Sequence, residues 1–205
     1  MNAKYSYVNL FPSPVHIFDI DEFDKLQDDL IDHVYKLKKQ DPNGHVISNR
    51  NGWQSKGFDL NFDGGVIHTT ILEVLKSFFF IKNTTSMVTS AWVNINSPGA
   101  YNVRHSHPES NLSGVLWVKC PKDSGNIEFI NPTAHQSYTE IEAYIDKFKE
   151  TNFVYQSYWF NPTEGRMMIF PSHLEHEVTQ NKSNEDRISI SFNIQLINSN
   201  RGRFS

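Results

Sequence analysis

The stretch Arg187-Ile188-Ser189-Ile190-Ser191-Phe192-Asn193 decides the fold class, because polar and apolar side chains alternate along it. Side chains two positions apart lie on one face of a β-strand, so Arg187, Ser189 and Ser191 share a face and the apolar residues take the other. The pattern therefore predicts a strand over residues 187–197.

The same period of two continues through most of the chain from residue 86 onward. It predicts strands over residues 87–96, 102–107, 112–119, 126–131, 153–160, 166–170, 174–180 and 187–197. Turns rich in Pro, Gly, Asn and Asp separate several of these segments. Residues 8–18 alternate loosely and contain two prolines, which predicts an edge strand, because proline cannot donate to a ladder.

The first third of the chain has a different pattern. Apolar residues at three- and four-residue steps predict an amphipathic helix over 22–39, with Asp21 as its N-cap, and a second helix over about 65–80. Residues 41–57 are expected to form a loop, in which Trp53 and Gln54 could form a lid or substrate rim, and residues 138–150 a short helix.

Two helices followed by seven or eight closely spaced strands favour a mainly β fold with flanking helices, such as an antiparallel sandwich or jelly roll. A chain of 205 residues can bury one proper core, and it contains no internal repeat. We expect a single domain over residues 1–205, with N-terminal helical support over 20–80 and a β core over 86–197.

Composition excludes several classes of protein. A net charge of −4 does not suggest a nucleic-acid surface, and the longest apolar run, residues 78–81, is too short to cross a membrane. Cys120 is the only cysteine, so no internal disulfide can form, which fits a reducing compartment. With no signal peptide visible, we expect a soluble cytoplasmic protein. The sequence does not indicate an oligomeric state.

Histidines carry the candidate chemistry. His105 and His107 are two positions apart in a predicted strand, so both rings can face one metal ion, and a third ligand from another strand would leave coordination positions open for chemistry. His173 and His176 compete for that third place, since residues three apart in a strand face opposite sides. We favour His176, which starts an alternating segment, and expect His173 at the rim or facing outward.

Further residues are candidates for binding a ligand. Arg187 has a planar fork that suits a carboxylate, although it could also pair with a structural acid. Asn94 and Asn96 share a strand face and could bond a ligand, or could be ordinary polar residues at a strand end. Trp117 could donate through its indole, but core packing is the stronger interpretation.

Several motifs together resemble the 2-oxoglutarate/Fe(II) dioxygenase superfamily. Residues 96–107 resemble the strand and turn before the H-x-D motif of prolyl hydroxylases, 113–118 the strand that follows, and 170–178 with Arg187 their last two core strands. More narrowly, Ser48-Asn49, Gly52-Trp53-Gln54-Ser55, the H-x-H, Leu112-Ser113-Gly114-Val115 and residues 187–193 resemble a family of 2-oxoglutarate/Fe(II) oxygenases from marine bacteria and their phages.

The resemblance implies a double-stranded β-helix, which is the cupin-like jelly roll, and decarboxylation of 2-oxoglutarate to succinate coupled to hydroxylation of a C–H bond. It implies Fe(II) as the metal and, if the chain is phage-encoded, the host cytoplasm as the location. It also implies these roles: His105, His107 and His176 as iron ligands; Arg187, assisted by Ser189 or Ser191, at the far carboxylate of 2-oxoglutarate; and Trp117 near the cosubstrate. Asn94 and Asn96 stay candidates for the same ligand because of their shared strand face.

One residue departs from the superfamily pattern, which usually places Asp or Glu where this chain has His107. Three neutral imidazoles leave Fe(II) with its full charge, so the site should attract the dianionic cosubstrate well but stabilise oxidised iron less. Two alternatives stay open: a three-His oxygenase that uses no 2-oxoglutarate, and a cupin-like binding or assembly module with a vestigial metal site. The substrate, small-molecule or peptidyl, is not indicated.

Overall fold

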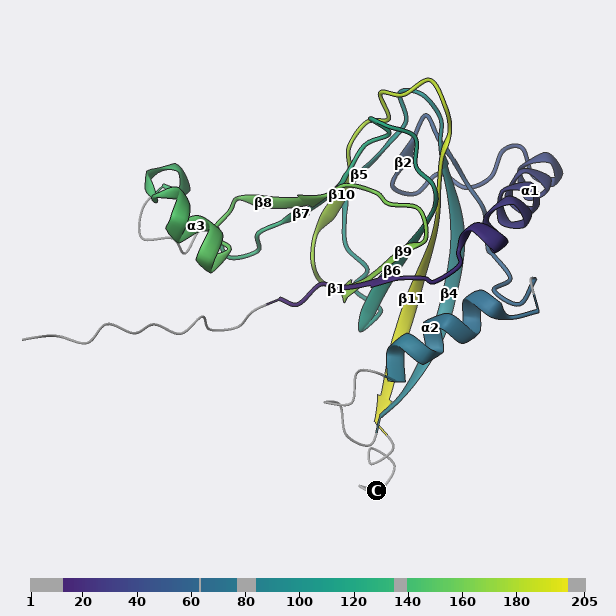
Figure 1. Cartoon of the computed structure of the whole chain (residues 1–205), viewed down its shortest axis with the longest axis horizontal. Helices are drawn as coiled ribbons and strands as arrows, with labels where there is room; N and C mark the ends of the chain where they lie inside the picture. The colour runs from purple at the N-terminus through teal and green to yellow at the C-terminus, as the bar shows by residue number, and fades with distance from the viewer. Residues whose placement is uncertain (1–12, 63, 77–83, 135–139, 199–205) are drawn as a thin grey trace, which may run out of the picture.

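Two antiparallel sheets form the body of the protein in the computed structural model, which describes residues 13–62, 64–76, 84–134 and 140–198 (Figure 1). The larger sheet has the order β1 (His16–Asp19), β9 (Arg166–Pro171), β6 (Leu112–Lys119), β11 (Arg187–Asn198), β4 (Thr84–Asn96) and β3 (Trp53–Gln54). The smaller has the order β2 (Asn49–Arg50), β5 (Tyr101–His105), β10 (His176–Val178), β7 (Ile127–Ile130) and β8 (Ser157–Phe160). This is the double-stranded β-helix that the sequence predicted.

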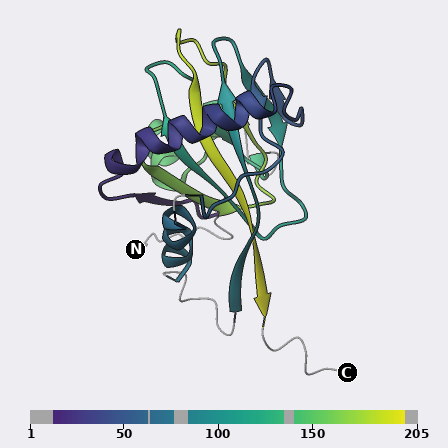
Figure 2. The ribbon, with the colours of Figure 1, turned by 90° about the vertical axis from the view of Figure 1, so that its right-hand side faces the viewer.

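Helices α1 (Asp24–Gln40) and α2 (Val66–Lys76) cover the outer face of the larger sheet, and Figure 2 shows α1 crossing its strands. Leu30 and Val34 of α1, together with Ile67 and Ile71 of α2, pack with the apolar side of the sheet in one core. Gln27 donates from its side-chain amide to the carbonyl of Val118 (2.8 Å), which ties α1 to β6. The helical support is therefore attached to the sheet that carries the alternating strand.

The central strand β11 contributes to both sides of its sheet. Ile188, Ile190 and Phe192 are fully buried in the core beneath the helices. The other face looks toward the smaller sheet, where Trp117 of β6, Phe129 of β7 and other apolar residues form a second core. Arg187, Ser189 and Ser191 lie on that inward face, so the polar half of the alternation points between the two sheets.

Most predicted elements are present with shifted ends. The strand over 112–119 is observed as predicted. The edge strand predicted over 8–18 appears as β1, which pairs with β9 alone among the described strands, while residues 8–12 lie outside the described part. The Asp21 cap is wrong: α1 begins at Asp24 with Phe23 at the N-cap, since Glu22 takes a positive φ of 55° that ends the helical geometry. The helix predicted over 65–80 is seen to Lys76, and residues 77–80 are not described.

The loop predicted over 41–57 contains two short strands, β2 and β3, which add to opposite sheets. Trp53 and Gln54 pair with β4 and are only 6% and 5% exposed, and the Trp53 indole donates to the carbonyl of Asp41 (2.8 Å). Their proposed role as a lid is therefore wrong, because both side chains are part of the body of the sheet.

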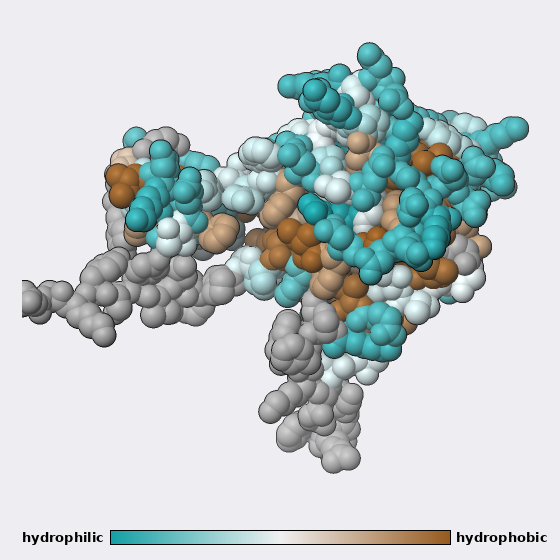
Figure 3. Space-filling view, viewed as in Figure 1, coloured by the Kyte–Doolittle hydropathy of each residue, from teal (hydrophilic) through white to brown (hydrophobic). Residues whose placement is uncertain are grey.

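An arm made by β7, β8 and α3 (Asp146–Asn152) extends away from the body in Figure 1. The short helix predicted over 138–150 appears as a 3-10 turn, Ile141–Ala143, followed by α3. Phe153 ends α3 in a left-handed conformation, and β8 starts at Ser157. Figure 3 shows mostly hydrophilic side chains over the body on this face, with apolar ones near the junction with the arm. No described helix is long and apolar enough to span a membrane.

Candidate metal centre

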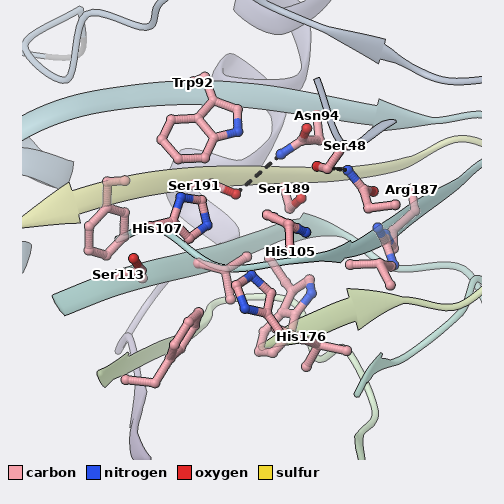
Figure 4. A pocket seen from close by; sticks show the side chains of 18 residues that line it. Ser48, Trp92, Asn94, His105, His107, Ser113, His176, Arg187, Ser189 and Ser191 are labelled. Atoms are coloured by element: carbon pink, nitrogen blue, oxygen red, sulfur yellow. Dashed lines mark hydrogen bonds between the residues drawn. The ribbon is translucent and has the colours of Figure 1, made fainter. Parts of the chain in front are cut away.

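Three histidines from different parts of the fold come together between the sheets. His105 ends β5 and His176 begins β10, and these two residues are directly paired across the antiparallel strands. His107 lies two residues beyond the end of β5. One ring nitrogen of each histidine lies within 4.8 Å of the others, which is close enough for one metal ion to be shared (Figure 4).

Backbone carbonyls orient two of the rings. Nδ1 of His105 lies 2.8 Å from the carbonyl oxygen of Val103, and Nδ1 of His176 lies 2.9 Å from that of Leu174. Because a carbonyl oxygen can only accept, Nδ1 must carry the proton in both rings. Each Nε2 therefore keeps a free lone pair, which is the state in which a histidine binds a metal.

Burial keeps the three rings neutral. Desolvation lowers the pKa of His105, and it lowers the pKa of His107 to about 4, with a smaller contribution from the neighbouring His105. The pKa of His176 falls to about 3, mainly through desolvation and then through the charge that His105 would carry. Neutral imidazoles are competent metal ligands at neutral pH, so no proton has to be displaced.

His107 owes its place to contacts outside its strand. Its backbone N–H donates to the carbonyl of Ser172 (2.9 Å), and its ring lies against Trp92 with a centroid distance of 5.6 Å. Ser172 is fully buried, and its hydroxyl meets that of Ser113 at 2.7 Å. Ser113 in turn donates to Oδ1 of Asn193 on β11 (2.9 Å), so a buried hydrogen-bond chain joins the His107 loop to the central strand.

Arg187 lies at the opposite end of the same pocket, as Figure 4 shows. The residue is 2% exposed, its Nη1 reaches only the carbonyl of Gly125 at 3.5 Å, and its buried Nε has no partner. No carboxylate pairs with it in the described part of the chain, and the adjacent Asp186 accepts a hydrogen bond from Tyr35 instead (2.9 Å). Desolvation lowers the Arg187 pKa to about 10, which leaves the guanidinium charged at neutral pH.

A row of small polar side chains connects the two ends. Ser189 is paired with Asn94 on one side and Trp117 on the other, and Ser191 with Trp92 and Val115. The Asn94 amide donates to the Ser191 hydroxyl (3.2 Å), while its buried Oδ1 has no partner. The pocket is narrow, with a cavity volume of about 50 Å³, so its walls lie close to whatever it holds.

The other predicted site residues divide into two groups. Trp117 lines the pocket and packs in the core between the sheets. Asn96 is not among the lining residues, and its amide donates to Asn102 (3.0 Å), which does line the pocket. His173 is exposed, in keeping with the expectation that it faces outward.

Sequence reasoning missed part of the pocket wall. Trp92 lies two positions before Asn94 on the same face of β4, so the alternation that selected Asn94 could also have selected Trp92. Asn102 donates to Ser48 (3.1 Å), and both residues line the pocket although they come from distant segments. No periodic signal joins those two positions.

The residues present fit a metal ion and a carboxylate ligand. Three neutral nitrogen donors suit a divalent transition metal. A buried guanidinium without a counter-ion, at the other end of a polar channel, suits an anionic group held through a planar fork. An anion that spans the two ends would bind a metal with one end and Arg187 with the other.

A protein-family model described as "Putative 2OG-Fe(II) oxygenase" matches residues 90–193, which is just over half of the chain and includes the three histidines and Arg187. No curated protein matches the sequence significantly.

Solved structures show the same fold at low sequence identity. A prolyl-4-hydroxylase from Pseudomonas putida aligns at a TM-score of 0.57 and 14% identity, over 88% of this chain and 91% of that one. The viral collagen prolyl hydroxylase from Paramecium bursaria Chlorella virus-1, in complex with 2-oxoglutarate, aligns at 0.52 and 18%, over 87% and 94%. A Trichoplax adhaerens prolyl hydroxylase bound to a peptide fragment of hypoxia inducible factor aligns at 0.56 and 13%, over 93% and 87%.

Proposed function

Since the chain belongs to the 2OG-Fe(II) oxygenase family, we propose that His105, His107 and His176 hold its Fe(II) and that Arg187 binds the far carboxylate of 2-oxoglutarate. The family makes the protein a 2-oxoglutarate-dependent dioxygenase, with Fe(II) as its metal and 2-oxoglutarate as its cosubstrate. Bound iron and 2-oxoglutarate together supply the oxidation of a C–H bond, with succinate and CO₂ as by-products.

One observation carries the proposal: a buried guanidinium without a counter-ion faces three clustered histidines across one pocket. An uncompensated buried charge costs several kcal/mol, so a fold keeps one where a ligand neutralises it. 2-Oxoglutarate has a carboxylate at each end, so one end can bind the metal while the other meets the cation. An ordinary structural arginine would have an acidic partner, and Arg187 has none among the described residues.

The polar row on β11 would complete the cosubstrate site. The Ser189 and Ser191 hydroxyls can donate to carboxylate oxygens, and Asn94, whose carbonyl oxygen lacks a partner, can turn its amide toward the ligand. Trp117, which is paired with Ser189 on the neighbouring strand β6, lines the pocket beside this row and excludes water. In this proposal Asn96 acts indirectly, by orienting Asn102.

The narrow pocket sets a condition on binding. A cavity of about 50 Å³ holds only a few water molecules. The cosubstrate must therefore displace these waters and move lining side chains apart, which removes water from around Arg187 and strengthens the ion pair.

The His107 end of the pocket is proposed as the substrate side. Trp92, Ser113 and Phe170 line it, so it combines apolar surface with one hydroxyl. We propose a peptidyl substrate or a small organic molecule. The peptide bound to the Trichoplax protein supports the first, and the limited cavity supports the second.

We also propose a cytoplasmic location and a single-domain organisation. A lone cysteine supports the reducing cytoplasm, which would be that of the host if a phage encodes the chain. The attachment of α1 and α2 to the larger sheet supports a single domain over residues 1–205, with the helical support over 20–80 and the β core over 86–197.

The test combines metal binding with turnover. The purified chain should bind one Fe(II) under anaerobic conditions, and in air it should release succinate from 2-oxoglutarate even without substrate. His105→Ala and His176→Ala should lose the iron, while the matched control His173→Ala should keep it. Iron binding without any succinate, across peptide and small-molecule candidates, would favour the binding-module alternative.

A further inference from the structure

A second pocket lies where three connecting loops meet, and none of the residues that line it belongs to the candidate metal centre. Its wall consists of residues 120–126, between β6 and β7, residues 161–162, which follow β8, and residues 179, 180 and 182, which follow β10. The cavity volume is about 560 Å³, which lies in the range of about 300–1,000 Å³ typical of small-molecule sites. It is therefore large enough for a ligand of its own.

The charged groups that line this pocket are mostly positive. Lys122 and Lys182 are exposed, and neither forms an ion pair within the described ranges. Asp123 is the only carboxylate among the lining residues, so the charge of the wall is positive by one unit. The Lys182 N–H donates to the carbonyl of Asp123 (2.9 Å), which joins the two loops that carry the lysines.

Ser124 supplies an independent sign of a ligand. The residue is only 1% exposed, lines the pocket, and has a buried hydroxyl with no hydrogen-bond partner. The hydroxyl of Thr179, by contrast, accepts a hydrogen bond from the Asn126 N–H (2.8 Å). Leaving a hydroxyl buried and unpaired is unfavourable, so its partner should come from whatever fills the pocket.

The chemistry of the wall favours an anion over a cation. A single exposed carboxylate cannot provide a cation site. Cys120 does not change this, because burial holds its thiol protonated. Ammonium groups and a hydroxyl donor together suit the oxygens of a small carboxylate or phosphate.

We propose that this pocket binds a small oxyanion, with the Ser124 hydroxyl donating to one oxygen and Lys122 and Lys182 supplying the positive charge. Ser124 makes the site more than a pair of surface lysines, because its hydroxyl is the one buried donor in the wall without a partner. The proposal does not depend on the function assigned to the histidines.

Any test must distinguish anion binding in this pocket from anion binding at Arg187. Its Nη1 reaches the carbonyl of Gly125, which also belongs to the second pocket, so an anion that bound at Arg187 would disturb the same loop. Arg187→Met removes the cation from the metal-centre pocket and leaves every residue of the second pocket in place.

The experiment is a titration of the full-length, ¹⁵N-labelled chain with inorganic phosphate at constant ionic strength, following the amide signals of Ser124 and Gly125. Wild type and Arg187→Met should show the same saturable shifts. Ser124→Ala should weaken binding about tenfold, and Lys182→Met about fivefold because an exposed charge is screened. Lys76→Met, a charge-matched control on α2, should bind as wild type does. A parallel titration with sodium acetate distinguishes a carboxylate site from a phosphate site.

Saturable binding of either anion with these losses supports the site. Shifts that rise linearly without saturation, or equal affinity in Ser124→Ala, Lys182→Met and wild type, would overturn it. Loss of binding in Arg187→Met would place the anion on Arg187 and would also overturn it. If Ser124→Ala does not fold, Lys122→Met and Lys182→Met carry the same comparison, since both side chains are exposed and removable.

Discussion

Replacing Arg187 with methionine should make the ligand-free protein more stable and abolish its response to 2-oxoglutarate. The fall of the Arg187 pKa from 12.5 to about 10 measures how much folding disfavours the charged form. This shift corresponds to about 3 kcal/mol at neutral pH. The cost is present at all pH values below the folded pKa of about 10 and disappears only above the unfolded value.

A methionine side chain is of similar length but carries no charge, so the substitution removes this cost. It also removes the hydrogen bond to Gly125, but at 3.5 Å that bond is weak. Replacing a buried charge by an apolar side chain of similar volume is often stabilising by about 1–4 kcal/mol. We expect a gain of about 1–3 kcal/mol in the free energy of unfolding of the metal-free variant, measured by urea denaturation with tryptophan fluorescence.

The ligand should stabilise only one of the two proteins. With Zn(II) bound as an inert metal, 2-oxoglutarate at a hundred times its dissociation constant should stabilise wild type by about 2.7 kcal/mol and leave Arg187→Met unchanged. Arg166→Met is the control, because Arg166 pairs with Asp19 at the surface (2.7 Å), and its loss should change stability by less than about 1 kcal/mol. The reasoning would be refuted if Arg187→Met lowered the free energy of unfolding by about 2 kcal/mol or more and 2-oxoglutarate did not change the stability of wild type.

Three further predictions concern the histidines. His176→Ala should lose bound metal and His173→Ala should retain it, as measured by metal analysis after dialysis; the reverse result would mean that the wrong third ligand was chosen. His107→Asp should keep iron, because a carboxylate oxygen is a competent ligand, and should decarboxylate 2-oxoglutarate faster without substrate, because the carboxylate offsets one positive charge on the metal; slower succinate release would count against it. The pKa values of His107 (about 4) and His176 (about 3) lie below those of the unfolded chain, so protonation favours unfolding. The metal-free protein should therefore lose about 2 kcal/mol per ring as the pH falls from 7 to 5, while His176→Gln should lose less; parallel urea midpoints would contradict this.

The parts of the fold that the sequence predicted best are the strands in the middle of the larger sheet, whose two faces pack against different layers. In β6, Leu116 and Val118 lie in the core beneath the helices, and Val115 and Trp117 lie in the core between the sheets. The arm that carries α3 and β8 has no such constraint: α3 contains no buried residue, and the predicted strand over 153–160 begins four residues late at Ser157. Local pattern cannot place a segment whose contacts are few.

The candidate site was predictable to the same extent. Strand periodicity places His105 and His176 inward, and the structure pairs them directly. His107 was expected on the same strand, but β5 ends at His105, and the position of His107 depends on Ser172 and Trp92, which are distant in sequence. Tertiary contacts of this kind have no period, which is also why the burial of Trp53 in a short strand was not foreseen.

Stability and chemistry share one strand in this protein. One face of β11 holds Ile188, Ile190 and Phe192 in the core, and the other presents Arg187 to the pocket. A slip of one residue would place the charged group in the core and isoleucine in the site, so both faces enforce a single register. Gly114 tightens this further, because a Cβ there would lie 2.3 Å from the Phe192 ring. The packing of its neighbours therefore fixes Arg187 in the pocket that also holds the histidines. The unfavourable buried charge is tolerated because the apolar half of the same strand holds it in place.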